Sequence, residues 1–159
     1  MHRLLYPGGV TVRGSVGLLL LRLAVGSAFM CHGWFKIMSE NGDFTMFRWM
    51  PPDAGVPGIM QGLAAFCEFG GGLAWILGLL TPLASLGIIC TMVTAITTVH
   101  LKDPFVPREP GRSSELAVVY LAVALLLLLA GPGLFSLDAL LFGRRASTTG
   151  EPPPGTVPR

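Results

Sequence analysis

The stretch IMQGLAAFCEFGGGLAWILGLLTPLASLGIICTMVTAITTV, residues 59–99, sets the architecture of the chain, because its single formal charge is Glu68. Two other stretches have the same character: residues 14–35 contain only Arg22, and residues 116–130 contain no charge. A helix of about 20 apolar residues crosses the ~30 Å hydrocarbon layer of a membrane. Residues 59–99 are long enough for two crossings. The sequence therefore predicts an all-α fold with four transmembrane helices.

The second and third predicted helices are separated by Leu79-Leu80-Thr81-Pro82, with almost no polar loop. Proline fits the first turn of a helix, where its missing N–H would be unpaired in any case. We therefore expect a tight hairpin within an antiparallel bundle. The connections 36–58 and 101–114 are longer and polar. An even number of crossings places both connections on one side of the membrane and both termini on the other.

Two shorter segments are predicted to form helices at the membrane interface. Residues 43–50 alternate polar and bulky apolar side chains, and aromatic residues of this kind settle at the interface. This segment is expected to cover the loop side of the bundle. After the break Gly131-Pro132-Gly133, Ser136 is expected to cap a helix that carries Asp138 in its first turn.

The composition excludes several classes of protein. Charged residues make up 13% of the 159 residues and hydrophobic residues 52%, whereas a soluble domain has about 25% charged residues. This balance excludes a cytosolic globular protein. A net charge of +2 without a basic block supplies too few phosphate contacts for nucleic-acid binding. The three cysteines form no CxxC pair, which excludes a small disulfide scaffold and a zinc ribbon.

We divide the chain into an N-terminal cytoplasmic segment (1–13), a membrane domain (14–143) and a C-terminal tail (144–159). The tail is polar and rich in proline, so it is predicted to be disordered. Lysine and arginine are equally numerous on the two sides of the membrane. The pair Arg144-Arg145 beside the last helix favours cytoplasmic termini.

Ionisable residues within the bilayer are candidates for a site, because each is unfavourable there unless it finds a partner. Helical spacing groups Arg22, Gly26, Phe29, Gly33 and Lys36 on one face of the first helix, and Glu68, Gly71, Gly72 and Trp75 on one face of the second. Counting inward from the loop side puts Arg22 about 21 Å deep and Glu68 about 15 Å deep. We therefore expect an Arg22–Glu68 ion pair. It either belongs to a site or only locks the two helices together.

A second polar group lies nearer the loop side, at helix ends that the topology brings together. It consists of His32, Lys36, His100 and Glu115, with Thr97 one turn before His100. One interpretation is a vestibule that holds a quinone head group, a sulfur oxyanion or a metal. The other is a set of interface anchors that extend to water. HxxxH and ExxH spacings are lacking, so we predict no metal site.

The cysteines offer a possible redox site. Cys31 and Cys67 each precede a polar residue, and such a neighbour alters the reactivity of a thiol. Their predicted depths are about 7 Å and about 15 Å, which fit poorly to the ~4.4–6.8 Å Cα separation of a disulfide. The favoured interpretation is buried, inert cysteine, and Cys90 is also expected to pack in the interior.

Several groups of residues occur in a particular order along the chain. They are Arg22, Phe29, Gly33 and Lys36 in the first helix, EFGGG (68–72) and LGLLT (77–81) in the second, His100 after the third, and GPGLFSLD (131–138) after the fourth. In this order they resemble the DoxX family of small four-helix membrane proteins, over roughly residues 18–141. The resemblance implies a bacterial inner-membrane protein. It also implies redox-linked relatives, among them the membrane subunit of a thiosulfate:quinone oxidoreductase and a partner in a thiol and superoxide defence complex.

By position, the resemblance implies that Arg22, Lys36, Glu68 and His100 bind charge or handle protons. The chain lacks CxxC, histidine pairs of the haem type within helices, and a dinucleotide-binding glycine loop after a strand. Electron transfer would therefore need a bound quinone or a partner subunit. No cofactor is fixed by the sequence, and a quinone is the candidate.

The sequence leaves two main hypotheses for function. The first is a redox-linked membrane subunit of a larger complex, associated with quinone or with sulfur and thiol chemistry. The second is a non-catalytic adaptor or assembly factor that docks other membrane proteins. A small-solute permease is a third hypothesis. The expected partners are the lipid bilayer and either a protein subunit or a second copy of the chain, and no nucleic acid.

Overall fold

The computed structural model describes residues 11–106 and 113–142, and every regular element in these ranges is helical. The elements are α2 (Val12–Ile37), the 3-10 helix η1 (Pro52–Ala54), α3 (Gly58–Leu77), α4 (Thr81–Thr94), the π-helix η2 (Ala95–Val99), α5 (Glu115–Ala130) and α6 (Leu137–Phe142). The predicted all-α class is thus confirmed for these ranges, where an isolated bridge joins Met38 to Phe44. Residues 1–10 of the predicted N-terminal segment and the predicted disordered tail lie outside the described residues.

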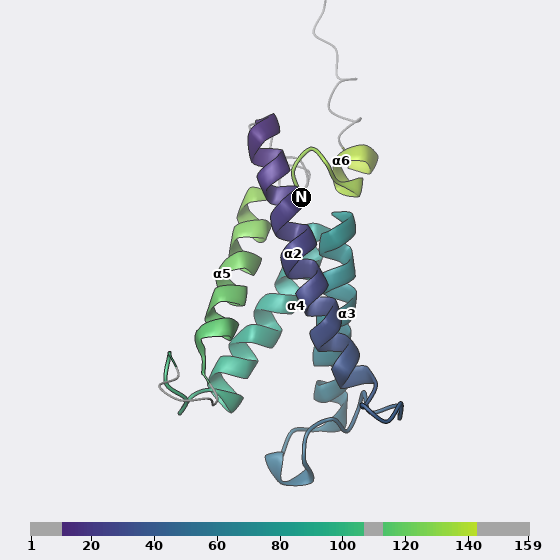
Figure 1. The fold of residues 1–159 in the computed structure, drawn as a ribbon, viewed down its shortest axis with the longest axis vertical. Coiled ribbons are helices and arrows are strands. Elements are labelled where there is room, and N and C mark those ends of the chain that lie inside the picture. The colour runs from purple at the N-terminus through teal and green to yellow at the C-terminus, as the bar shows by residue number, and fades with distance from the viewer. Residues whose placement is uncertain (1–10, 107–112, 143–159) are drawn as a thin grey trace, which may run out of the picture.

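The four long helices lie along the longest axis of the molecule (Figure 1). Helix α2 packs on α3, and α4 packs on both α3 and α5. Residues 38–57 and 101–106 lie at one end, here called the loop end, while α6 and the start of α2 lie at the other, the terminal end (Figure 1). Between the helices is a core of buried apolar residues: Phe29, Trp75, Ile88, Met92, Ala117, Ala124 and Leu127.

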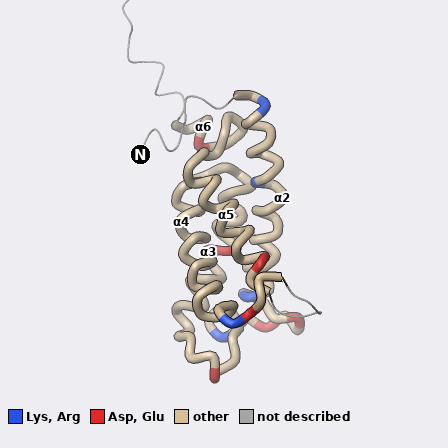
Figure 2. Tube along the Cα trace, turned by 90° about the vertical axis from the view of Figure 1, so that its left-hand side faces the viewer, with Lys and Arg blue, Asp and Glu red and all other residues tan. Residues whose placement is uncertain are grey.

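The outer surface of the bundle suits a membrane. Three helical stretches are long and apolar enough to cross one: Val12–Ile37, Gly58–Leu77 and Thr81–Val99. Leu20, Phe66 and other large apolar side chains face outward along them, and Figure 2 shows most charged residues toward the two ends. Helix α5 is also apolar but has only 16 residues. The chain is therefore a membrane protein, and its fourth crossing stays a prediction.

Small residues allow α2 and α3 to approach closely. A methyl group on Gly72 would lie 2.6 Å from the carbonyl oxygen of Gly26 and 2.8 Å from the amide nitrogen of Met30. A methyl group on Gly33 would overlap the backbone of Phe69. Such close packing replaces the hydrophobic driving force that helices lack in lipid. It confirms the predicted inner faces, whose buried members are Arg22, Gly26, Phe29 and Gly33 in α2 and Glu68, Gly71, Gly72 and Trp75 in α3.

The hairpin between α3 and α4 is held in place by α6. Leu80 adopts a φ of 49°, a left-handed conformation that is uncommon for a residue with a side chain. The carboxylate of Asp138 accepts hydrogen bonds from the N–H groups of Leu80 at 2.7 Å and Thr81 at 2.9 Å. Asp138 thus caps α4 from a distant part of the chain. Ser136 caps α6 as predicted, accepting from the N–H of Ala139 at 3.0 Å.

The predicted surface helix at residues 43–50 is wrong, because this segment forms turns and the neighbouring short helix is η1. The cause lies at the end of α2. Thr45 donates its N–H to the carbonyl of Ile37 at 2.8 Å and its hydroxyl to the carbonyl of Lys36 at 3.1 Å. The last carbonyls of a helix have no partner within it. Residues 43–50 donate hydrogen bonds to these carbonyls through Thr45, so the segment folds back on α2 and does not form a helix.

Candidate functional site

Arg22 is 1% exposed, and its guanidinium donates hydrogen bonds to backbone carbonyls. Its Nε donates to Trp75 at 2.8 Å, Nη2 to Phe135 at 3.0 Å and Ile76 at 3.3 Å, and Nη1 to Pro132. These carbonyls lie at the end of α3 and in the segment after α5, and that of Trp75 also accepts from the N–H of Gly78 at 3.1 Å. Arg22 therefore fastens α2 to the end of α3 and to the segment that follows α5.

The predicted ion pair between Arg22 and Glu68 is wrong. Trp75, whose carbonyl binds Arg22, lies about two turns beyond Glu68 in α3, or ~10 Å further along the helix. The prediction matched charge with charge and did not consider the backbone carbonyls at helix ends. At the end of a helix, these carbonyls are strong acceptors and carry the negative pole of the helix dipole. They therefore hold the arginine without a carboxylate.

Glu68 pairs instead with Lys36. Lys36 Nζ lies 2.5 Å from Oε1 of Glu68, and the side chains are 23% and 3% exposed, respectively. The same Nζ lies 4.6 Å from the centroid of the Trp49 ring, a cation–π contact. The sequence placed Lys36 and Glu68 in separate groups. The long lysine side chain joins the two groups by reaching inward from the end of its helix.

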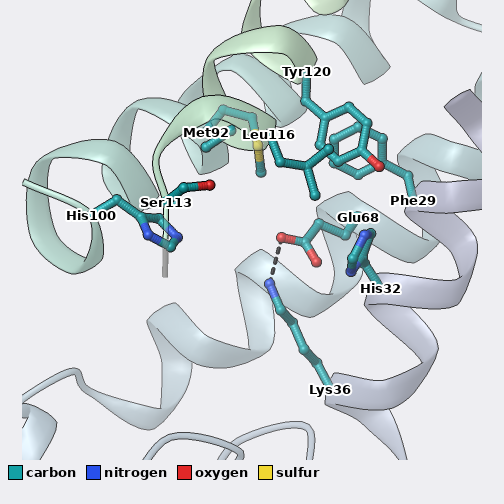
Figure 3. A pocket seen from close by; sticks show the side chains of 11 residues that line it. Phe29, His32, Lys36, Glu68, Met92, His100, Ser113, Leu116 and Tyr120 are labelled. Atoms are coloured by element: carbon teal, nitrogen blue, oxygen red, sulfur yellow. Dashed lines mark hydrogen bonds and ion pairs between the residues drawn. The ribbon is translucent and has the colours of Figure 1, made fainter. Parts of the chain in front are cut away.

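The Lys36–Glu68 pair lies in the wall of a pocket of about 260 Å³ at the loop end of the bundle. Side chains from α2, α3, α4, η2 and α5 converge on this space (Figure 3). The lining residues are Phe29, His32, Lys36, Glu68, Met92, Ala95, His100, Ser113, Leu116, Ala117 and Tyr120. The pocket therefore combines titratable groups with aromatic and aliphatic walls.

The structure brings part of the predicted vestibule to this pocket. His32, Lys36 and His100 line it, whereas Glu115 is exposed outside it. The hydroxyl of Thr97 donates to the carbonyl of Val93 at 2.8 Å and does not face the pocket.

Sequence reasoning did not find the contribution of α5 to the pocket. Tyr120 is the one aromatic residue in this otherwise aliphatic helix, a signal that could have singled it out. Met92 and Ser113 also line the pocket, but no feature of the sequence marks them.

Glu68 offers the pocket an unpaired acceptor. Oε1 binds Lys36, while Oε2 is buried and has no hydrogen-bond partner among the described residues. Figure 3 shows the carboxylate of Glu68 facing the side chains that line the pocket. A buried acceptor without a donor is unfavourable by about 1–3 kcal/mol. Oε2 is therefore suited to receive a hydrogen bond from a ligand.

The inner wall of the pocket is aromatic. The ring centroids of Phe29 and Tyr120 are 4.7 Å apart, and those of Tyr120 and His32 are 6.0 Å apart. Phe29 is fixed from behind by an edge contact with Trp75, at 5.5 Å between centroids. Apolar walls with a few placed polar groups are typical of sites for small organic molecules.

His100 is positioned by the π-helix η2. Its N–H donates to the carbonyl of Ala95 at 3.0 Å, which closes the wide turn of a π-helix. Such turns recur at functional sites, because they shift the following side chain around the helix axis. Nδ1 of His100 lies 2.8 Å from Oδ2 of Asp103. In the neutral ring this bond takes the Nδ1 proton and leaves Nε2 as an acceptor.

The three cysteines are free thiols, and none lines the pocket. Cys67 is half-buried, whereas Cys31 and Cys90 are exposed, so the expected burial is wrong for these two. A thiol is apolar enough to face lipid, which removes the need to bury it. Within residues 11–106 and 113–142, no three His, Cys, Asp or Glu side chains are grouped so that they could hold a metal ion.

The fold and the pocket define an all-helical membrane protein with a partly polar site between its helices. Residues 17–101, which contain most of α2 and all of α3, α4 and η2, match the DoxX family. The chain therefore belongs to the DoxX family, and the identification from its sequence is confirmed. The residues that α5 contributes to the pocket lie beyond the matched range.

Two relatives resemble the chain over most of their length. CatD of Bacillus subtilis (strain 168), whose name assigns it provisionally to the oxidoreductases, is 31% identical over 128 residues, covering 80% of this chain and 89% of CatD. The inner membrane protein YqjF of Escherichia coli (strain K12) is 34% identical over 130 residues, covering 80% of this chain and 93% of YqjF. No solved structure matches the chain.

Proposed function

We propose that this protein is a redox-linked subunit of a larger complex in a bacterial inner membrane, and that its pocket holds the ring of a quinone-type molecule. The observation that carries the proposal is the unpaired Oε2 of Glu68 beside Lys36, opposite an aromatic wall. A quinone ring is flat and largely apolar, and it exchanges protons at its oxygens. Carboxylate, ammonium and imidazole groups are the side chains that transfer protons in proteins.

The size of the pocket supports a head group as the occupant. Its volume of about 260 Å³ lies below the ~300–1,000 Å³ of sites that enclose a drug-sized molecule. A single substituted ring fits such a space, with any lipid tail outside it. A sulfur oxyanion, the other candidate, needs a free cation. The ammonium of Lys36 is already neutralised by Glu68, so the pocket favours a neutral ring.

We further propose that α5 forms the fourth crossing of an antiparallel bundle with both termini in the cytoplasm. Apolar residues continue past its end through Leu134 and Phe135, which lengthens the hydrophobic span. The Arg144-Arg145 pair favours a cytoplasmic C-terminus. In this orientation the pocket opens near the side of the membrane opposite to the cytoplasm.

Purification in mild detergent tests the proposal. Bound quinones are extracted and quantified, protein partners are identified by mass spectrometry, and quinone-dependent turnover of the intact complex is measured. We expect about one quinone per chain and an oxidoreductase partner. The Glu68→Gln variant is expected to lose most of the reduced quinone, the form whose hydroxyl can donate to Oε2, whereas Glu115→Gln, outside the pocket, retains it.

A different outcome favours the adaptor hypothesis. Protein partners that bind wild type and Glu68→Gln equally, with no quinone in either preparation, would contradict the redox proposal. Such an adaptor would have to dock through the outer surface of the bundle. Three small residues suited to helix docking, Gly26, Gly33 and Gly72, are already used between α2 and α3.

A further inference from the structure

The pocket holds one carboxylate oxygen that has no hydrogen-bond donor among the described residues. Glu68 Oε2 is an acceptor, since its carboxylate is paired with the ammonium of Lys36 through Oε1. The other polar groups of the lining can donate: Ser113 and Tyr120 carry hydroxyls, and the rings of His32 and His100 donate or accept according to their tautomer. The strongest donor in the pocket, Lys36 Nζ, is engaged by Glu68 and by the face of Trp49. Oε2 of Glu68 is therefore a buried group that can only accept a hydrogen bond and that lacks a donor among the described residues.

The charge of the pocket limits the ligand further. A cationic donor would approach the ammonium of Lys36, which is 2.5 Å from the carboxylate that it already neutralises. An anion would approach the unpaired carboxylate oxygen. Because the Lys36–Glu68 pair has no net charge, it does not offset the free energy that an ion loses on leaving water, so a charged ligand is unfavourable. A neutral ligand with an O–H or N–H group remains.

The walls select the shape of that neutral ligand. Phe29 and Tyr120 stand 4.7 Å apart between centroids on one side, and Met92, Leu116 and Ala117 contribute aliphatic surface. A flat ring matches such walls, and aromatic pairs contribute about 0.5–1.5 kcal/mol beyond the area that they bury. The hydroxyl of a ring in contact with Phe29 and Tyr120 can point toward Oε2 of Glu68.

We propose that the pocket selects a neutral aromatic ring that carries a hydroxyl donor over the same ring in its quinone form. The hydroxyl donates to Oε2 of Glu68, and the ring packs against Phe29 and Tyr120. This inference rests on the proposed function and sharpens it, because a quinone gains two hydroxyl groups on reduction. The shared chemistry, a phenolic O–H, is also present in a simple phenol.

A series of matched ligands tests the inference on the full chain in detergent, without air. The probes are trimethylhydroquinone, its dimethyl ether, trimethylquinone and trimethylphenol, with binding measured by calorimetry. We expect trimethylhydroquinone to bind at least about tenfold more tightly than the quinone or the ether, since both lack the donor. Equal binding of the three overturns the inference.

The phenol separates the two sources of the hydroxyl. If trimethylphenol binds as tightly as trimethylhydroquinone, a single hydroxyl is recognised and the site takes phenols in general. If trimethylhydroquinone binds more tightly, the second hydroxyl is also recognised and a reduced quinone is the ligand. Either result supports the shared chemistry.

The variant Glu68→Gln reverses the polarity of the key group. Lysine has no acceptor, so the amide oxygen of the glutamine faces Lys36 and the NH₂ group replaces Oε2. We expect the preference for trimethylhydroquinone over trimethylquinone to disappear or to invert in this variant, while Glu115→Gln retains it. An unchanged preference in Glu68→Gln overturns the inference. The wild-type series needs no variant and decides the question even if Glu68→Gln does not fold.

The inference and the proposed function fail in different ways. Quinone-dependent turnover of the complex with equal binding of the reduced and oxidised rings would overturn the inference alone. A tenfold preference for the hydroxyl form, without a redox partner or turnover, would overturn the proposed function and leave the ligand class in place.

Discussion

Two cations within the bundle are neutralised in different ways. Arg22 binds four backbone carbonyls, whereas Lys36 binds a carboxylate and lies over an aromatic ring. The planar fork of arginine carries five N–H donors and can serve several carbonyls at once, whereas the ammonium of lysine is a compact charge on a flexible stem. Each residue type therefore suits its position: Arg22 fastens the helix ends, and Lys36 reaches the pocket.

Replacing Arg22 is expected to destabilise the fold strongly. Arg22→Met removes every donor to the carbonyls of Trp75, Ile76, Pro132 and Phe135, and we expect a loss of about 3 kcal/mol or more in the free energy of unfolding. Arg22→Lys is expected to keep part of this free energy of unfolding, because lysine can donate to some of the four carbonyls but not to all of them. Unfolding with sodium dodecyl sulfate in mixed micelles measures the change. The exposed Arg48→Met is the control, and equal stability of Arg22→Met and Arg48→Met would contradict this role.

A double-mutant cycle tests the Lys36–Glu68 pair. Lys36→Met leaves the carboxylate of Glu68 buried without its partner, and we expect a loss of about 3–5 kcal/mol in stability. Lys36→Met combined with Glu68→Leu removes both charges and is expected to recover most of the loss, because apolar groups need no partner. The same micelle titration reports both. Additive losses in the double variant would show that the two side chains do not interact.

At the scale of the helices, much of the architecture is local in sequence and could therefore be predicted. The predicted membrane spans follow from long stretches with little or no charge. The cap of α6 follows from Ser136, whose hydroxyl oxygen accepts a hydrogen bond from the N–H of Ala139, three residues later. The inner faces of α2 and α3 follow from helical spacing. Each of these features depends on residues close together in the chain.

The turns at residues 43–50 failed through local contacts with the end of α2, whereas the other parts that failed depend on contacts between distant segments. The carbonyls that bind Arg22 come from the end of α3 and from the break after α5, and no rule of spacing within one helix brings them together. The same holds for Asp138, which caps α4 rather than serving only its own helix. The pocket depends on Tyr120 of α5, a helix whose contacts are set by the whole bundle.

The packing of α2 on α3 leads to a prediction about two neighbouring glycines. Gly72→Ala would place a methyl group 2.6 Å from the carbonyl oxygen of Gly26, so the helices must separate and stability is expected to fall by about 1–3 kcal/mol. Gly70→Ala, two residues earlier and on another side of α3, meets only the ring of Phe66 at 3.8 Å. It is expected to be neutral or to stabilise by up to about 1 kcal/mol through helix propensity. Equal effects of the two substitutions in the micelle titration would contradict the proposed close approach.

For the whole molecule, the proposed redox role would make the position of the pocket decide where protons enter and leave. The Lys36–Glu68 pair and His100 lie toward the loop end, so proton exchange with water would occur on the side of residues 38–57. If the termini are cytoplasmic, that side faces away from the cytoplasm. A redox reaction in the pocket would then exchange protons outside the cytoplasm, and the orientation of the chain becomes part of its mechanism.

Cysteine labelling on intact cells tests this orientation together with the fourth crossing. In a chain with Cys31, Cys67 and Cys90 replaced by alanine, we introduce Asp53→Cys at the loop end or Ser147→Cys in the C-terminal tail. A membrane-impermeant maleimide is expected to label Asp53→Cys in intact cells and Ser147→Cys only after the membrane is opened. An even number of crossings with cytoplasmic termini gives this pattern. Labelling of Ser147→Cys in intact cells, with Asp53→Cys also labelled, would leave α5 short of the far side and place the C-terminus with the loops.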